Sequence, residues 1–198
     1  MEPHFKKTTV LGVGLIGASF SLALKKCGLC GTVTGFGRTV ENLRRAKDRG
    51  IIDSFELSPD KACHDADLVV FATPVGLFSS LAKQIKEVLK KDAVVIDVGS
   101  VKEKVVSELE DIFGSRFVGC HPIAGGESSG IDQSSPELFK GALCIMTKTE
   151  KTDEEVFRNI SKTWEAIGAR VEPMSPADHD RVYALVSHIP HVIAYALV

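Results

Sequence analysis

Short apolar runs alternate with amphipathic stretches from residue 8 to residue 174. This alternation is typical of strand–helix units that build a largely parallel sheet. The apolar runs predict strands at Thr8–Val13, Thr32–Phe36, Asp67–Ala72, Ala93–Val98, Phe117–Cys120 and Ala142–Met146. The clearest helical patterns lie at Leu15–Lys26, Val40–Arg49, Phe78–Leu89, Val101–Ile112 and Glu154–Ile167. The pattern therefore predicts an α/β protein with a doubly wound, mainly parallel sheet.

Residues that commonly begin and end helices support these boundaries. Thr152 and Glu155 have the spacing of a capping box, in which two side chains bond backbone N–H groups of the first helical turn. Gly50 and Gly168 follow predicted helices at the position where glycine often ends them. We therefore expect the helix after Thr152 to begin with a capping box and both glycines to terminate helices.

The composition is that of an ordinary globular protein. The chain has 198 residues, of which 44% are hydrophobic and 25% charged, with a formal net charge of -2. Its basic residues are scattered, which argues against nucleic acid or an anionic membrane as a partner. No apolar run reaches the roughly 18 residues of a membrane span, and the N-terminal residues predict a strand rather than a signal peptide. We therefore expect a cytoplasmic protein.

The cysteines indicate thiols rather than a disulfide framework. An odd number of them occurs in a chain without a secretory signal: Cys27, Cys30, Cys63, Cys120 and Cys144. Cys27 and Cys30 close a predicted helix instead of beginning one, so no helix dipole activates them, and no second ligand pair accompanies them as a zinc site would need. We expect reduced, structural thiols and no metal.

A glycine-rich turn follows the first predicted strand and opens a helix: Gly12-Val13-Gly14-Leu15-Ile16-Gly17. Gly12 allows the tight turn, Gly14 lets the backbone approach a pyrophosphate, and Gly17 permits close packing of helix and strand. The N–H groups at the start of the helix can bind phosphate. In this strand–turn–helix setting the motif predicts a Rossmann-like, dinucleotide-binding domain, which we assign to residues 1–173.

The residue expected to bind the cofactor's ribose is not acidic. In NAD-binding folds a carboxylate usually follows the second strand, but here Gly37 takes its place and is followed by Arg38 and Thr39. Without the carboxylate a 2′-phosphate is not repelled, and a guanidinium can bind it with two hydrogen bonds. We therefore expect NADP to be favoured. If Arg38 only stacks on the adenine or lies in solvent, NAD remains usable.

Further candidate residues follow later strands, at the sheet edge where open α/β folds bind ligands. Thr73 and Pro74 follow one strand, and Ser100 follows another. Ser100 is a candidate cap for the next helix together with Glu103, either as a cap alone or as a cap that also contacts ligand. His121 follows the fifth predicted strand, and histidine is suited to accept a proton or hydrogen bond from a substrate hydroxyl. The alternative for His121 is a loop histidine bonded to backbone.

The pattern changes after residue 173. Ser175 and Pro176 can begin a helix whose apolar side chains repeat at helical spacing to the last residue, namely Val182, Leu185, Val186, Ile189, Ile193 and Leu197. Such a stripe needs a surface to pack against. We therefore expect residues 174–198 to be the first helix of an incomplete helical C-terminal domain for dimerisation and substrate binding. Docking of this helix back on the first domain is the alternative.

Two histidines of this helix are candidate substrate contacts. His188 and His191 are three residues apart and lie on adjacent helix positions, and Pro190 between them bends the axis. The bend can direct His191 into the cleft. Zinc binding is disfavoured because no His-Glu-x-x-His pattern or cysteine pair accompanies them. We expect substrate contact, with core or capping histidines as the alternative.

With GVGLIG, DVGSVK, GCHPIAGGESSG and SHIPH in this order, the chain resembles the prephenate and arogenate dehydrogenase family of tyrosine biosynthesis. The resemblance covers essentially all of the chain. It implies an oxidative decarboxylation in which hydride leaves the ring carbon bearing the hydroxyl, the ring carboxylate departs as carbon dioxide, and the ring becomes aromatic. The implied activity is prephenate dehydrogenase with NAD(P), which yields 4-hydroxyphenylpyruvate, and arogenate dehydrogenase is the alternative.

The resemblance also implies roles for individual residues. His121 is similar to the histidine that bonds the ring hydroxyl and withdraws its proton, and Ser100 to the serine that links this histidine to nicotinamide and substrate. His191 resembles a substrate contact, and Glu127 an acidic residue beside the entrance. The family's helical C-terminal domain supplies a substrate-binding arginine and the usual dimer interface, and we expect it to lie outside these residues. Gly37 departs from the Asp of NAD-using members.

Two other functions share parts of this pattern. A β-hydroxyacid dehydrogenase would have the same fold and cofactor, but it normally needs a catalytic lysine on the helix after the sheet, which nothing in the sequence marks. A nucleotide-sensing Rossmann module without turnover would not need His121, Ser100 and His191 together. We therefore expect an NAD(P)-dependent dehydrogenase acting on a small-molecule substrate.

Overall fold

The computed structural model describes residues 4–125 and 130–188. These residues form one sheet in the order β3-β2-β1-β4-β5-β6-β7-β8. Its strands are β1 (Phe5–Leu11), β2 (Cys30–Phe36), β3 (Ser54–Glu56), β4 (Leu68–Phe71), β5 (Val94–Asp97), β6 (Phe117–Pro122), β7 (Leu143–Thr147) and β8 (Arg170–Met174). Strands β1 to β6 are parallel, whereas β7 is antiparallel to β6 and β8 runs parallel to β7. The predicted doubly wound, mainly parallel α/β fold is confirmed.

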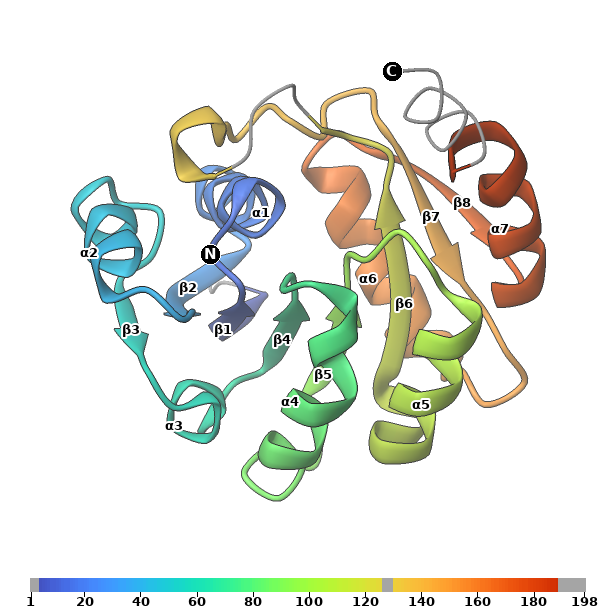
Figure 1. Ribbon diagram of the computed structural model, residues 1–198, viewed down its shortest axis with the longest axis horizontal. Coiled ribbons are helices and arrows are strands. Elements are labelled where there is room, and N and C mark those ends of the chain that lie inside the picture. The colour runs from blue at the N-terminus through green and yellow to red at the C-terminus, as the bar shows by residue number, and fades with distance from the viewer. Residues whose placement is uncertain (1–3, 126–129, 189–198) are drawn as a thin grey trace, which may run out of the picture.

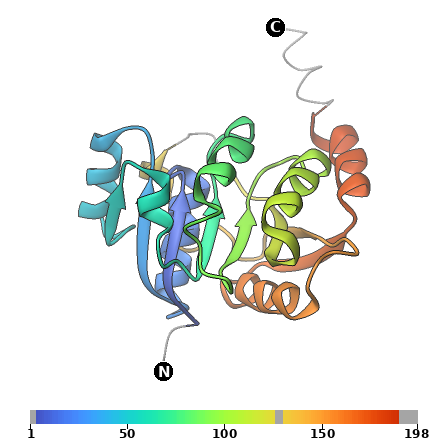
Figure 2. The same cartoon turned by 90° about the horizontal axis from the view of Figure 1, so that it is seen from below.

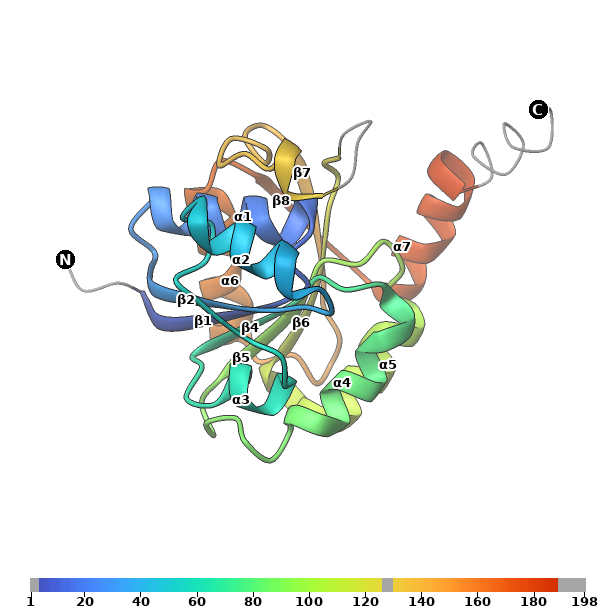
Figure 3. The same ribbon diagram turned by 60° about the vertical axis from the view of Figure 1, so that its left-hand side comes forward.

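Helices cover both faces of this sheet. They are α1 (Leu15–Lys26), α2 (Val40–Asp48), α3 (Pro59–Cys63), α4 (Phe78–Ile85), α5 (Glu103–Phe113), α6 (Glu154–Ala166) and α7 (Pro176–Tyr183). Figures 1 and 2 show α1 and α6 on one side of the sheet and α4 and α5 on the other. Helix α7 lies beside α5 at the end of the domain (Figure 3).

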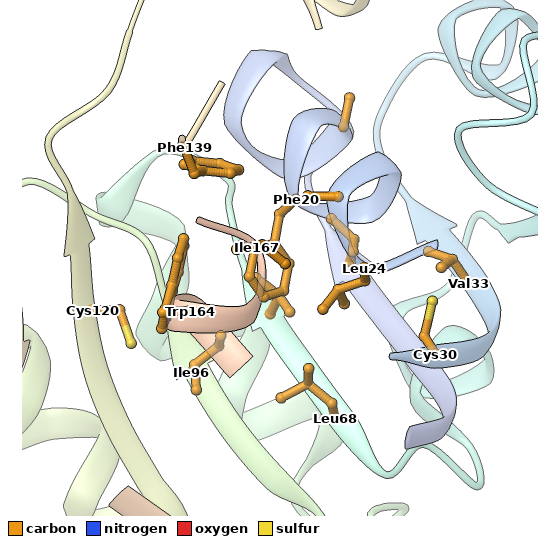
Figure 4. Close-up of a cluster of buried hydrophobic side chains, with 14 of the residues drawn as sticks. Phe20, Leu24, Cys30, Val33, Leu68, Ile96, Cys120, Phe139, Trp164 and Ile167 are labelled. Carbon is orange, nitrogen blue, oxygen red and sulfur yellow. The ribbon is translucent and has the colours of Figure 1, made fainter. Parts of the chain in front are cut away.

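Each face of the sheet has its own hydrophobic core. On the α1 and α6 side, the Trp164 ring lies 4.8 Å from the ring of Phe20 and 5.2 Å from that of Phe139, centroid to centroid (Figure 4). On the α4 and α5 side, Phe71 packs against Phe78 at 5.4 Å. Because both faces are covered, every residue of β4 is buried. Burial on two faces explains why the central strands are continuous apolar runs.

Two strands were not predicted, and both lie at the edges of the sheet. β3 has three residues, and β8 has the burial of an edge strand, with Arg170, Glu172 and Pro173 exposed. Proline fits such a position because an edge strand leaves some N–H groups unpaired. Neither strand has the apolar run on which the prediction depended. One helix was also predicted too long, since α4 ends at Ile85 rather than at Leu89.

The boundaries of α6 correct one prediction and support another. The capping box of Thr152 and Glu155 is wrong, because Asp153 is the N-cap and its carboxylate accepts the backbone N–H groups of Glu155 at 2.8 Å and Val156 at 3.0 Å. A carboxylate is favoured there by the positive end of the helix dipole. Gly168 follows α6 with φ +94°, a conformation that glycine adopts without strain.

The remaining global features follow from the described residues. All five cysteines are free thiols, and Cys27 is exposed whereas the other four are buried. Within residues 4–125 and 130–188, no three His, Cys, Asp or Glu side chains are grouped so that they could hold a metal ion. In the same part of the chain, no helix has the length and apolar character that a membrane crossing requires.

Candidate active site

The glycine turn after β1 brings backbone against backbone. Gly12 has φ +109°, and a Cβ there would lie 2.5 Å from the carbonyl carbon of Ala72 after β4. A Cβ on Gly17 would lie 2.2 Å from the Gly12 oxygen. A Cβ on Gly14 would meet nothing within 4 Å, so this glycine leaves open space before α1. The first and third glycines are thus needed for packing, and the second leaves room for a group to approach the helix.

The start of α1 has the properties of an anion-binding terminus. Gly14 is its N-cap and has no side chain to cap the helix, and the first turn begins with Leu15 and Ile16 and contains no acidic residue. The first N–H groups of a helix have no partner within the helix, and its dipole places partial positive charge at this end. A phosphate group is the ligand that such a terminus favours.

A cavity of about 390 Å³ lies beside this turn, between the loops that follow β2 and β4. The strand order reverses at β1 and β4, which is where ligands bind in open α/β sheets. Residues predicted to bind cofactor line it, namely Gly12, Gly14, Arg38, Thr39, Thr73 and Pro74. The Thr73 hydroxyl is buried and has no hydrogen-bond partner in the described part of the chain. An unpaired buried hydroxyl beside this cavity fits a ligand with hydroxyl or phosphate oxygens.

The loop after β2 places a cation at the mouth of this cavity. Arg38 is exposed, lines the cavity and forms no ion pair with the described residues. A Cβ on Gly37 would lie 3.4 Å from Leu43, which is ordinary van der Waals contact, so space alone does not exclude a side chain there. Asn42, which the sequence analysis missed, donates from Nδ2 to the Val13 oxygen at 3.0 Å and ties α2 to the glycine turn.

A buried ion pair holds the turn between β5 and α5. The side chains of Asp97 and Lys102 are fully buried, and Lys102 Nζ lies 2.6 Å from Asp97 Oδ2. The same ammonium donates to the oxygens of Gly99 at 2.7 Å and Val101 at 3.1 Å. Burial raises the pKa of Asp97, and the nearby Lys102 offsets this only in part. Asp97 Oδ1 also accepts the N–H of Cys120, which links the turn to β6.

Ser100 lies in this turn with an exposed side chain, at the carboxyl edge of the sheet. The prediction that it caps α5 together with Glu103 is wrong, because the N-cap position belongs to Lys102. The N–H groups of Lys102 and Glu103 instead donate to the two carboxylate oxygens of Asp180, at 2.7 and 2.9 Å. A carboxylate from α7 thus performs the capping, and the hydroxyl of Ser100 is not used for it.

His121 lies at the carboxyl end of β6 and is connected to α7 by hydrogen bonds. Its Nδ1 is 2.8 Å from Nε2 of His179, whose Nδ1 is 2.7 Å from Oδ1 of Asp180. The side chain of His179 is fully buried, and its ring stacks on Tyr183 with centroids 4.7 Å apart. His121 therefore lies within β6 rather than in a loop, and its ring bonds the side chain of His179. Sequence analysis missed His179 and Asp180 because only the fold brings α7 to β6.

The charge of Asp180 is stabilised where it lies. Burial by itself raises the pKa of this carboxyl, but hydrogen bonds from the N–H groups of Glu103 and Lys102 and from His179 outweigh burial and hold the pKa below its ordinary value. Asp180 is therefore an anion at neutral pH. It connects the start of α5 with the imidazole chain that ends at His121.

The glycine turn and His121 lie at the same edge of the sheet. β6 is three strands from β1, and the strands between them are β4 and β5. At about 4.8 Å per strand, the carboxyl ends of β1 and β6 are about 14 Å apart. Thr73 and Ser100 lie after the two strands between them, on the same edge as the start of α1 and His121.

The remaining predicted substrate contacts are Glu127, His188 and His191. Glu127 and His191 lie outside the described residues. His188 ends a π-helical turn, Ala184–His188, that continues α7. The apolar stripe of this helix is exposed as far as it is described, with Leu185 and Val186 each 64% exposed.

Comparison with models of protein families shows which family the chain matches. Residues 20–173 match the model of the nucleotide-binding domain of prephenate dehydrogenase, and residues 175–198 match the model of its dimerization domain. Among curated relatives, a cyclohexadienyl dehydrogenase from Zymomonas mobilis is 36% identical over 195 residues, which cover 98% of this chain and 67% of that protein.

Solved structures agree with this assignment. A prephenate dehydrogenase from A. aeolicus, in complex with hydroxyphenyl propionate and NAD+, superimposes with a TM-score of 0.92 at 41% identity, covering 97% of this chain and 68% of that one. Synechocystis arogenate dehydrogenase gives 0.88 at 31% identity, covering 96% and 67%. The chain spans 67% and 53% of the first two curated relatives. The chain belongs to the prephenate dehydrogenase family.

Proposed function

We propose that the protein is a prephenate dehydrogenase that converts prephenate to 4-hydroxyphenylpyruvate and carbon dioxide. The observation that carries the proposal is the position of His121, at the carboxyl end of β6 and on the same sheet edge as the glycine turn of α1. Support comes from the A. aeolicus relative, which was solved with a phenolic acid and NAD+.

The residues of the cavity fit a nicotinamide dinucleotide. Gly14 and the start of α1 would hold its diphosphate, and the unpaired hydroxyl of Thr73 would bond one of its oxygens. When bound, the nicotinamide accepts the hydride that leaves the substrate ring. Arg38, Thr39 and the absence of a carboxylate at Gly37 favour NADP over NAD, although the relative in complex has NAD+.

The roles of the protein's own residues follow from their positions. His121 would bond the ring hydroxyl and accept its proton, which lets the C–O bond gain carbonyl character while hydride departs. Ser100 would orient the same hydroxyl from the end of β5. His188, His191 and Glu127 remain proposed substrate contacts. No further catalytic base is needed, because loss of the ring carboxylate as carbon dioxide makes the ring aromatic.

The domain organisation is also a proposal. We assign residues 1–173 to the dinucleotide-binding domain and residues 174–198 to the first helix of a helical domain that forms a homodimer. The match to a dimerization-domain model supports this division, as does the exposure of Val182, Leu185 and Val186 on α7 and its continuation. A cytoplasmic homodimer acting on a small molecule is the proposed working form.

One assay tests the activity and the substrate. The whole protein is incubated with prephenate or arogenate and with NADP or NAD, and absorbance at 340 nm is recorded. Turnover with prephenate supports the proposal. Turnover with arogenate alone favours the second candidate, which the likeness to Synechocystis arogenate dehydrogenase supports. No reduction of either nucleotide with either substrate would remove both.

His121→Asn tests the proposed base. We expect kcat to fall roughly 10²–10⁴-fold, the range for loss of an acid–base group, while KM changes much less. His64 offers a matched control, since it is an exposed histidine that pairs with Asp65 far from the carboxyl edge, and His64→Asn should leave kcat unchanged. A normal kcat for His121→Asn would exclude His121 from the chemistry.

Cofactor preference is tested at two adjacent residues. Arg38→Ala should raise KM for NADP and spare NAD. Gly37→Asp should reverse the preference toward NAD, because the carboxylate would repel a 2′-phosphate and the site has room for a Cβ. Equal effects of Arg38→Ala on both nucleotides would show that Arg38 does not bind the 2′-phosphate.

A further inference from the structure

Three side chains form a continuous hydrogen-bonded chain between α7 and the end of β6. Asp180 Oδ1 is 2.7 Å from Nδ1 of His179, and Nε2 of His179 is 2.8 Å from Nδ1 of His121. The Asp180 carboxylate is further fixed by the two N–H groups that begin α5. None of these links follows from the glycine motif or from the sequence around His121, and the activity proposed above does not require them.

The direction of each hydrogen bond follows from the chemistry of its atoms. An ionised carboxylate only accepts, so the proton between Asp180 and His179 belongs to Nδ1 of His179. In a neutral imidazole one nitrogen donates and the other accepts, so Nε2 of His179 is the acceptor. The proton of the next bond therefore belongs to Nδ1 of His121. It follows that Nε2 of neutral His121 carries the lone pair.

The surroundings support this assignment. The side chain of His179 is fully buried, and burial disfavours an imidazolium that would donate from both nitrogens. The aromatic ring of Tyr183 stacks on His179 and lies 5.0 Å from the His121 ring. The charges of Lys102 and Asp97 are matched by their own ion pair, and the carboxylate of Asp180 is bonded directly to His179.

We propose that His179 and Asp180 are positioning residues, which hold the proton of His121 on Nδ1 and present Nε2 to the substrate. This proposal rests on the proposed function. In the step itself, the O–H bond of the substrate hydroxyl breaks and an N–H bond forms at Nε2 of His121. The positive charge that develops on His121 is then stabilised through His179 by the carboxylate of Asp180. A histidine held by a carboxylate in the correct tautomer is a general device in catalysis.

The tautomers are measurable without any substrate. Protein with 15N-labelled histidine is examined by NMR, in which long-range couplings distinguish a proton on Nδ1 from one on Nε2. We expect the neutral imidazole rings of His121 and His179 both to carry their proton on Nδ1. A proton on Nε2 of His121 in the wild-type protein would overturn the proposal, whether or not prephenate is oxidised.

Two substitutions at His179 separate positioning from packing. His179→Phe keeps an aromatic ring on Tyr183 but has no acceptor for the Nδ1 proton of His121. His179→Gln loses the ring, but its amide has both an acceptor oxygen and a donor nitrogen and can bond His121 and Asp180. Proper folding of both variants is checked by circular dichroism and thermal melting. Asp178→Asn, which removes an exposed carboxylate of the same helix, is the control.

The expected kinetics differ from those of a structural role. We expect kcat of His179→Phe to fall roughly 10–100-fold, less than for loss of His121 itself because the base remains, with KM nearly unchanged. His179→Gln should recover most of that loss, and Asp178→Asn should be normal. The NMR spectrum of His179→Phe should show a larger population of the His121 tautomer that carries its proton on Nε2.

The outcomes distinguish the two proposals. If the wild-type protein oxidises neither substrate, the proposed function fails. The tautomers of the wild-type protein still test whether His179 and Asp180 hold the proton of His121 on Nδ1. If it is active but His179→Phe keeps normal kcat, the positioning role fails while the function stands. A variant at position 179 that does not fold would leave the wild-type NMR measurement as the deciding one.

Discussion

Replacing Lys102 with Met removes the cation from the buried ion pair beneath the β5–α5 turn. Methionine is close to lysine in length and apolar, so packing is largely kept. The substitution removes three hydrogen bonds, to Asp97 Oδ2 at 2.6 Å, to the Gly99 oxygen at 2.7 Å and to the Val101 oxygen at 3.1 Å. It also leaves the Asp97 carboxylate without its cation, in a side chain that is fully buried.

The expected loss of stability follows from that unpaired charge. Breaking a buried ion pair by removing one partner costs about 3–5 kcal/mol of the free energy of unfolding. The N–H groups of Gly99 and Cys120 still bond Asp97 and keep the loss from being larger. For a domain of this size each kcal/mol lowers the melting temperature by about 2–4 °C. We therefore expect a decrease of roughly 6–20 °C.

Urea unfolding followed by circular dichroism measures the loss directly. Lys104→Met is the matched control, because Lys104 is 85% exposed and its nitrogen is 3.7 Å from Glu108, so its removal should change stability little. The double variant Asp97→Asn with Lys102→Met should recover part of the loss, since it leaves no buried charge. A loss below about 1 kcal/mol for Lys102→Met would refute the view that this pair is desolvated and holds the turn.

The pH dependence of the same variant has a definite sign. The pKa of Asp97 is already raised by burial, and Lys102 is the group that most lowers it. A carboxyl whose pKa is raised on folding destabilises the protein fully above its folded pKa, and this cost declines as pH falls through the folded pKa and is gone below the unfolded pKa. Removal of Lys102 raises that pKa further. The stability difference between Lys102→Met and wild type should therefore shrink on acidification from pH 7.

Two further predictions concern the glycine turn and the thiols. Gly12→Ala should cost more than about 2 kcal/mol in urea unfolding, because its φ is +109° and its Cβ would lie 2.5 Å from backbone after β4, whereas Gly14→Ala should keep stability and weaken nucleotide binding. Iodoacetamide followed by mass spectrometry should label exposed Cys27 first, because burial raises the pKa of Cys30 to about 11 and of Cys63 to about 12. Faster labelling of Cys63 than of Cys27 would contradict the prediction about the thiols.

The sequence predicted those elements whose pattern is local. Central strands such as β4 are buried on both faces and therefore appear as apolar runs, and the helices between them carry an apolar stripe. The edge strands β3 and β8 were not predicted, because many of their side chains are exposed to solvent and they therefore lack an apolar run. The cap of α6 was misplaced by one residue, since Thr152 and Asp153 are both good capping residues and only the backbone decides between them.

The site was predictable where strand ends meet at one sheet edge. The glycine turn, Thr73 and Ser100 follow strands and His121 lies at the carboxyl end of one, so a parallel sheet brings them to one edge whatever the details of packing. The partners of His121 were not predictable in this way. His179 lies 58 residues away on a helix that the sequence assigned to another domain, and its contact depends on how α7 packs on α5.

That packing places α7, which the sequence assigned to a second domain, beside the candidate active site. Asp180 of α7 caps α5, which follows the turn that holds Ser100, and through His179 it also reaches His121. The same carboxylate therefore stabilises a helix start and orients an imidazole. A shift of α7 relative to α5 and β6 would break the bonds from Asp180 to the start of α5 and the bond from His179 to His121, whereas the bond between His179 and Asp180 lies within α7. The boundary between the two matched domain models lies near residue 174, and the hydrogen bond between His121 and His179 crosses it.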